Sequence, residues 1–350
     1  MTMKKILKID QQTQQLTAIS IALFLLMIIL RPNNFLKPAN IHSMLLQLVE
    51  PGLFALCISL AYLSRGIDLS IVSIANLVGI INGVILRSYI TPASTEGETV
   101  AILLLCLLVG LAIGVLCGLF NGFLIAELGI LPILVTLGTQ NLFMGIAMVI
   151  TQGRAEGNFP SILLKLADVN LLGFGRFSGI PLVTGFFLVV FITVCIVVHK
   201  TPYGLKLQWY GSSKQVSYFT GINNKMVIYT TYLISGLIAS TAGFVIMARS
   251  NSAKADYGLT YVFLALLINV LAGISPLGGR GKVYNVILSL VALQILSTGF
   301  NMLRVSPLIR DSLFGFLLVF SIILDYVLAR RQAEKLNRRA ILAAKASNNQ

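Results

Sequence analysis

The sequence predicts an all-α polytopic membrane protein, and three observations support this. Of its 350 residues, 57% are hydrophobic and only 11% are charged, whereas a soluble domain carries about 25% charged residues. The apolar residues gather in long runs, close to the roughly 20 residues that cross a bilayer as a helix. The runs do not alternate with a period of two, so the pattern does not fit a membrane β-barrel.

Ten apolar runs are candidate transmembrane spans, and only the eighth is short. The first follows the basic segment "MTMKKILKID" and meets "RPNNF" after Leu30. No cleavage site of small residues follows it, so we expect an uncleaved first span. The expected span cores, in chain order, are 15–30, 43–64, 70–90, 99–126, 132–151, 181–199, 225–247, 260–275, 283–303 and 308–328.

The second span contains an acidic side chain, Glu50, followed by Pro51. We expect Glu50 to bond with the backbone that the proline frees. The alternative is a proton- or sodium-coupled carrier with Glu50 as its coupling acid. That class often needs buried acids as its relay, and acidic residues in the spans are few: besides Glu50, Asp325 lies near the end of the tenth.

The second and third spans are separated by "LSRGIDLSIVS" (63–73). Gly66 is expected to end the second span. Asp68 is placed to cap the third span and to accept hydrogen bonds from the amides near Ser70 and Ile71. We therefore interpret Gly66, Asp68 and Ser70 as a structural motif, in preference to a substrate-binding role for Asp68.

A weak internal repeat relates two span junctions, "LGILPILV" (128–135) and "LRVSPLIR" (303–310). Each follows a long span and contains a proline where a new span starts. The two copies lie five spans apart, and an odd offset gives them opposite orientations. This is the inverted repeat of many transport proteins.

Ten spans place both chain ends on one side of the membrane. Assigning the ends to the cytoplasm puts most lysines and arginines inside, the basic tail 329–350 included, and the acidic loop "TPASTEGET" (91–99) outside. The net charge of +14 therefore fits membrane topology rather than nucleic-acid binding. Two connections are long: an outer one, 152–180, expected to cap a vestibule or meet an external partner, and an inner one, 200–224.

The sequence predicts no catalytic, metal or cofactor site. "GGRGKV" (278–283) lacks Walker spacing, because Pro276 stands where glycine is needed and Val283 follows Lys282. The two histidines, His42 and His199, lie at opposite ends of different spans, and the four cysteines fall inside apolar runs without metal or redox spacing. We therefore expect a transporter without enzymatic activity, and any ATP it consumes must be bound by a separate subunit.

Several segments together resemble the permease subunits of bacterial ATP-binding-cassette importers for simple sugars. The similarity covers about residues 40–328. Its segments are "SRGIDLSIVSIANLVGII" (64–81), "LFNGFLIAELGILPILVTLGTQNLFMGIAMVITQG" (119–153), "YGSSKQVSYFTGI" (210–222), "VLAGISPLGGRGKV" (270–283) and "GFNMLRVSPLIRDSLFGFLLVFSIILD" (299–325).

The resemblance implies a single permease domain over 1–350, with a fold like that of the vitamin B12 importer permease. It also implies an ATPase subunit, a second permease subunit and a periplasmic or lipid-anchored sugar-binding protein, at the bacterial inner membrane. The connection 200–224 becomes a cytoplasmic coupling loop whose short helix, about 211–221, docks on the ATPase. An ordinary amphipathic connector is the alternative from the pattern alone. The implied coupling residues are Gly211, Ser212, Lys214, Tyr218 and Gly221.

Some residues depart from the family pattern. Val72 replaces a glycine, Ser212 an asparagine and Ala272 a glycine, while Val216 and Ser217 stand where two alanines are common. These departures also fit one half of an unequal permease pair, so homodimer and heterodimer both stay open.

The transported sugar is not identified by the sequence. A related permease for branched-chain amino acids shares the fold, but "GIDLS" and "VTLGT" favour sugars. Polar side chains within the spans are expected to line the substrate path, although packing between helices explains them equally well. These candidates are Asn76, Asn82, Thr136, Gln140, Asn141 and Asn269.

Overall fold

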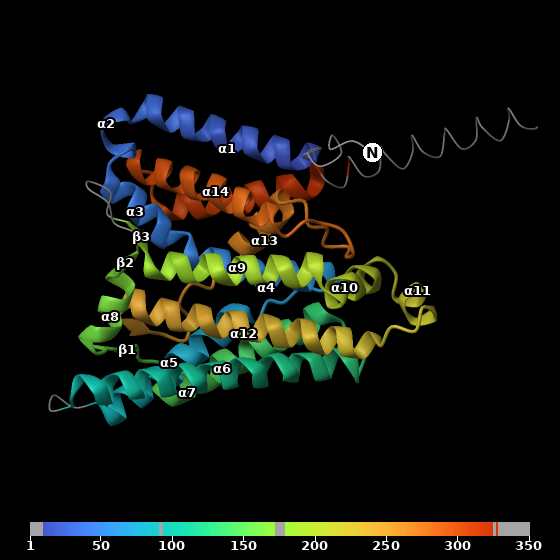
Figure 1. Cartoon of the computed structure of the whole chain (residues 1–350), viewed down its shortest axis with the longest axis horizontal. Helices are drawn as coiled ribbons and strands as arrows, with labels where there is room; N and C mark the ends of the chain where they lie inside the picture. The colour runs from blue at the N-terminus through green and yellow to red at the C-terminus, as the bar shows by residue number, and fades with distance from the viewer. Residues whose placement is uncertain (1–9, 91–93, 172–178, 325–326, 328–350) are drawn as a thin grey trace, which may run out of the picture.

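The computed structural model describes residues 10–90, 94–171, 179–324 and 327, which form a bundle of roughly aligned helices (Figure 1). Within that part, nine helical stretches are long and apolar enough to cross a membrane. They confirm the all-α membrane class and nine of the ten expected spans. They are α1 (Gln11–Leu30), α3 (Pro38–Gln47) continued by α4 (Val49–Leu63), α5 (Ile71–Tyr89), α6 (Glu96–Ala126), α7 (Pro132–Thr151), α9 (Leu182–Lys200), α12 (Asn224–Ser250), α14 (Asn285–Met302) and a final helix, Pro307–Leu324.

The eighth expected span is a half-length helix, α13 (Tyr261–Leu271). Its 11 residues rise about 16 Å, roughly half of the 30 Å hydrocarbon core of a bilayer. The loops on either side complete the crossing, and α13 lies about midway along the length of the bundle (Figure 1).

The two ends of the bundle differ. One end, called here the α11 end, carries α10 (Pro202–Ser212), α11 (Lys214–Phe219) and the loop 272–284 (Figure 1). The opposite end, the α8 end, carries the short helices and strands. These are α2 (Pro32–Phe35), α8 (Ser161–Asp168), and two antiparallel pairs, β1 (Glu156–Gly157) with β4 (Ser252–Ala253) and β2 (Asn170–Leu171) with β3 (Ile180–Pro181).

Pairing of β1 with β4 holds the connection 152–180 to the bundle. The amide of Phe159 also donates to the side chain of Asn251, at 3.0 Å. The described part of this connection therefore packs across the α8 end, as expected of a cap, while residues 172–178 lie outside the described residues.

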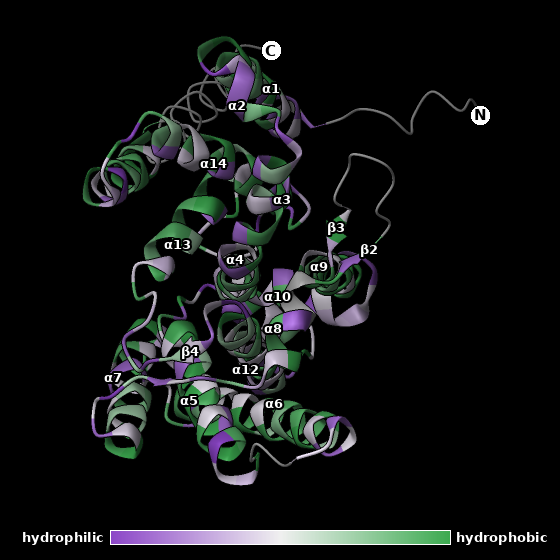
Figure 2. Cartoon of the chain, turned by 90° about the vertical axis from the view of Figure 1, so that its left-hand side faces the viewer, coloured by the Kyte–Doolittle hydropathy of each residue, from purple (hydrophilic) through white to green (hydrophobic). Residues whose placement is uncertain are grey.

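Helix α4 is buried along its whole length and lies at the centre of the bundle when the molecule is viewed end-on (Figure 2). Beside it, α6 and α12 pack backbone to backbone. A Cβ atom added to Gly114 would collide with the carbonyl oxygen of Gly236, and one added to Gly236 would collide with that of Gly114. Small residues at such crossings are what allow membrane helices to approach closely.

The two junctions of the predicted repeat have the same local geometry. Gly129 and Arg304 both adopt a positive φ, 67° and 59°, and each lies three residues before a proline that starts the next helix, Pro132 or Pro307. The first junction lies at the α11 end and the second at the α8 end. This geometry supports the inverted repeat.

Candidate functional site

Helix α11 forms an exposed apolar surface at the α11 end. Val216, Tyr218 and Phe219 are 60%, 71% and 85% exposed. The rings of Tyr218 and Phe219 contact each other edge to face. A helix of six residues cannot bury these side chains against itself, so they are available to a partner.

Hydrogen bonds fix α11 in place. Ser213 caps its first turn by accepting from the amide of Val216, at 3.3 Å. Ser217 donates to Asn224 at 2.7 Å, and Asn224 donates to the carbonyl of Lys214 at 3.0 Å. These hydrogen bonds attach α11 to the start of α12 and hold it in one orientation at the surface.

The predicted coupling residues separate into exposed and buried groups. Ser212, Lys214, Tyr218 and Gly221 are exposed, and Gly221 adopts a φ of 78° after α11. Gly211 is buried within α10, so the short helix does not begin at this residue as expected. The break falls at Ser213, whose hydroxyl can cap a new helix.

Gly211 is instead part of a junction between three of the motif segments. The amide of Gly279 donates to the carbonyl of Leu63 at the end of α4, at 3.1 Å. A Cβ atom on Gly211 would collide with that same carbonyl and with Gly279. The "GGRG" loop is therefore wedged between the ends of α4 and α10, which explains its glycines without a phosphate ligand.

The turn after α4 is closed by two backbone hydrogen bonds. Arg65 adopts a φ of 62° and donates to the carbonyl of Tyr62, while Gly66 donates to that of Ala61. This is a Schellman motif, in which glycine usually occupies the position of Arg65. The expected end of the second span at this point is consistent with the structure.

Asp68 is buried, and its carboxylate is held by hydrogen bonds within the protein, which fits a structural role. Its carboxylate accepts from the amide and hydroxyl of Ser70 and from the hydroxyl of Ser235 on α12. Ser70 in turn accepts from Asn121 on α6. Burial raises the pKa of the Asp68 carboxyl, and these hydrogen bonds oppose the shift. Asp68 does not cap α5 as expected, because the residue that precedes this helix is Ser70. Asp68 lies two residues further back and accepts from the Ser70 amide, and no bond from the Ile71 amide occurs among the described residues.

Three of the predicted path residues form hydrogen bonds that join helices and loops within the protein. Asn76 donates to the carbonyls of Ala255 and Tyr257. Thr136 donates to Ile67 at 2.9 Å. Asn269 donates to Ala55 on α4 and accepts from Ser59. Sequence alone left both interpretations open because the facing of each helix was unknown.

The other three path candidates differ from these. Asn82 is fully buried, and neither polar atom of its amide has a partner among the described residues. Gln140 and Asn141 lie near the middle of α7 on its open side, where Asn141 is exposed and Gln140 half-buried. Exposed amides at mid-depth are costly in lipid, so this side of α7 is suited to a polar path or a partner helix.

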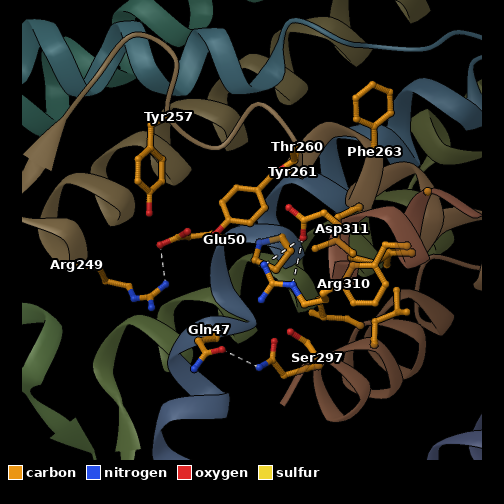
Figure 3. Close-up of a pocket in the computed structure, with 18 residues that line it drawn as sticks. Gln47, Glu50, Arg249, Tyr257, Thr260, Tyr261, Phe263, Ser297, Arg310 and Asp311 are labelled. Carbon is orange, nitrogen blue, oxygen red and sulfur yellow. Dashed lines mark hydrogen bonds and ion pairs between the residues drawn. The ribbon is translucent and has the colours of Figure 1, made fainter. Parts of the chain in front are cut away.

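A cavity of about 260 Å³ lies between α4, the start of α13, α14 and the final helix (Figure 3), and the end of α12 that contributes Arg249 to its wall is at the α8 end. Polar side chains from several helices and from the loop before α13 line it. They are Gln47, Glu50, Arg249, Tyr257, Thr260, Tyr261, Gln294, Ser297, Arg310 and Asp311.

Glu50 forms an ion pair with Arg249 at the end of α12, with 2.6 Å between carboxylate and guanidinium. The hydroxyl of Tyr261 lies beside it (Figure 3). The expected bond from Glu50 to backbone freed by Pro51 is wrong, because Pro51 lies in the first turn of α4, where amides need no helical partner. The sequence did not predict Arg249 as the partner of Glu50. The only sign of it was a single basic residue at the end of a span.

Several hydrogen-bonding groups around the cavity remain available. Gln294 donates to Gln47 at 3.3 Å and to Thr298, but its carbonyl oxygen has no donor among the described residues. The hydroxyls of Thr260 and Ser297 also have no hydrogen-bond partner in the described part of the chain. No group of three or more metal-ligating side chains occurs among the described residues.

Comparison with known proteins identifies the family. A family model described as "Branched-chain amino acid transport system / permease component" matches residues 40–322. The ribose import permease of Bacillus subtilis is 29% identical over 87% of this chain and 91% of its own length.

Two further relatives are the autoinducer 2 import system permease of Photorhabdus temperata, 27% identical over 78% of both chains, and the D-allose transport system permease of Escherichia coli, 26% identical over 86% of this chain and 87% of its own. No solved structure matches the chain significantly. These findings confirm a transport permease and favour it over an ion-coupled carrier. The chain belongs to the family of the permease components of branched-chain amino acid transport systems.

Proposed function

We propose that this permease is the membrane subunit of an ATP-driven importer that moves a simple sugar or a sugar-like polyol. The observation that carries the proposal is α11, which exposes Val216, Tyr218 and Phe219 on a rigid frame. Aromatic side chains of this kind are typical anchors of protein interfaces. A separate ATPase subunit is the partner that a permease without nucleotide motifs requires.

Substrate class is argued from the relatives and the motifs. The family description refers to branched-chain amino acids, whereas the three relatives compared above are named for ribose, autoinducer 2 and D-allose. The segments "GIDLS" and "VTLGT" also resemble those of sugar permeases. We therefore favour a sugar, with D-ribose and D-allose as the first probes.

A second permease subunit, identical or related, is proposed to cover the open side of α7. Gln140 and Asn141 lie there at mid-depth, and between two subunits they would face a polar path instead of lipid. The final helix is also largely exposed in the single chain, as expected for an element at the same interface.

The α11 end is proposed to face the cytoplasm and the α8 end the outside. Lys200, Lys206, Lys214 and Lys225 lie at the α11 end, which fits the excess of positive charge on cytoplasmic loops. The sugar-binding protein, periplasmic or lipid-anchored, would then dock on the α8 end, where the connection 152–180 packs.

The first test is purification of the tagged chain from its native host in mild detergent, with mass spectrometry of the proteins that accompany it. We expect an ATPase subunit in the sample, and the presence or absence of a related permease distinguishes the two forms of dimer. A chain that purifies alone and still drives uptake into vesicles without ATP would refute the importer.

The α11 surface is tested by replacing Tyr218 and Phe219 together with alanine. Loss of two interface aromatics is expected to weaken ATPase binding at least tenfold and to reduce ATP-driven uptake in reconstituted vesicles to a similar degree. Tyr89→Ala is the matched control, because Tyr89 is 66% exposed at the α8 end. Equal ATPase binding by both variants would contradict the docking role of α11.

A further inference from the structure

We propose that the cavity between α4, α13, α14 and the final helix is a binding site for the transported polyol within the permease itself. The inference rests on the proposed function and adds the location and chemistry of a substrate site. Among the described residues, this cavity is where side chains of opposite charge and uncommitted hydrogen-bonding groups meet an open volume.

The position of the cavity suits a solute entering from the α8 end. It lies where α13 begins, and this helix covers only about half of the bilayer core. Substrate sites of membrane transporters are often built at such discontinuous helices. Asn76 donates to the backbone carbonyls of Ala255 and Tyr257, so the loop before α13, which forms one wall of the cavity, is held in place.

The chemistry of the wall suits hydroxyl groups. A sugar presents donors and acceptors side by side, and the Glu50–Arg249 pair offers an acceptor next to a donor. Arginine has five N–H donors, and Glu50 engages one nitrogen at 2.6 Å. The carbonyl oxygen of Gln294 and the hydroxyl of Ser297 add groups that a ligand can satisfy without displacing an internal hydrogen bond.

Charge and size argue for a small neutral ligand. Glu50 is paired with Arg249, and Asp311 with Arg310 at 3.1 Å, so an ionic ligand would have to break one of these pairs. The volume of about 260 Å³ lies just below the range of roughly 300–1,000 Å³ found for drug-sized ligands. A single sugar ring fits these limits better than an oligosaccharide or an anion.

Removal of Glu50 or Arg249 is a poor test, because breaking a buried ion pair is strongly destabilising. Ser297 is better, since its hydroxyl has no partner among the described residues. In the reconstituted importer, with uptake of D-ribose and D-allose measured, Ser297→Ala is expected to raise KM about two- to tenfold, the loss of one hydrogen bond, at unchanged maximal rate. Ser297→Phe, which fills the cavity, is expected to reduce uptake at least tenfold.

The matched control is Ser88→Phe, an equally bulky change at the exposed end of α5. Folding is checked by ATPase binding, which all three variants should retain. If wild-type importer carries a probe sugar and Ser297→Phe carries it equally well, the cavity is not the site, although the proposed function stands. If wild-type importer carries neither sugar but carries leucine, the sugar assignment and this inference both fail.

A second measurement does not depend on transport. Ser297→Cys, introduced with Cys195→Ala, places a thiol in the cavity, and the other three cysteines are buried. The transported probe sugar is expected to slow maleimide labelling at this position at least threefold and to leave Ser88→Cys unaffected. Equal labelling with and without sugar would overturn the proposal.

Discussion

At the scale of single residues, Arg65 is held in a backbone conformation that side chains other than glycine adopt at a cost. Its φ of 62° is required because Arg65 and Gly66 close the turn after α4. The turn cannot relax, since the "GGRG" loop is attached to Leu63 beside it. The strain is therefore retained by the surrounding packing.

Replacing Arg65 with glycine should remove this cost. We expect Arg65→Gly to be more stable than Arg65→Ala by about 1 kcal/mol, since both remove the side chain and only glycine tolerates the positive φ. Thermal denaturation of the detergent-solubilised protein measures the difference. Equal midpoints for the two variants would show that the turn is not strained.

At the scale of secondary-structure elements, the crossing of α6 and α12 has the least room for change. Gly114 and Gly236 place backbone against backbone, and the Asp68 network joins the same two helices through Ser235 and Asn121. A displacement of α12 would thus break polar bonds as well as packing. This crossing is expected to fix the relative positions of the two halves of the chain.

Gly236→Ala tests this crossing. The added methyl group would collide with a carbonyl oxygen that cannot move aside, so we expect a loss of roughly 1–3 kcal/mol, as for overpacked cores. Gly97→Ala in the first turn of α6 meets nothing within 4 Å and should be neutral or slightly stabilising. The yield of monodisperse protein after gel filtration is the measurement, and similar yields would contradict close packing.

At the scale of the whole molecule, the single chain leaves one side of α7 uncovered, with the amide of Asn141 exposed at mid-depth. The proposed second subunit should lie within reach of Asn141. A photo-crosslinking benzoylphenylalanine at position 141 is expected to capture a permease-sized protein in native membranes, whether identical or related. The same group at Ile192, an exposed position of α9, should capture mainly lipid. Capture of no protein at position 141 would refute the interface.

Much of this architecture could be predicted from the sequence, because runs of about 20 apolar residues locate spans directly. The sequence also indicates that the eighth apolar run is shorter than the others. The features that could not be predicted depend on which side of each helix faces inward and on contacts between residues far apart in the sequence. The partner of Glu50 lies 199 residues away, and the roles of Asn76 and Asn269 depend on which side of each helix points inward. The short helix does not start at Gly211 as expected, because the close approach of Gly211 to Leu63 and Gly279 is a contact between distant segments that the local sequence does not reveal.

The half-length of α13 also has a consequence for how the protein is made. A segment of 11 residues is too short to enter a bilayer as an independent span, and its flanking loops would leave backbone groups unpaired in lipid. Its contacts with α4, through Asn269, Ala55 and Ser59, give it a place among helices already inserted. Biogenesis must therefore be ordered, with α13 entering the bundle only after α4 is in place.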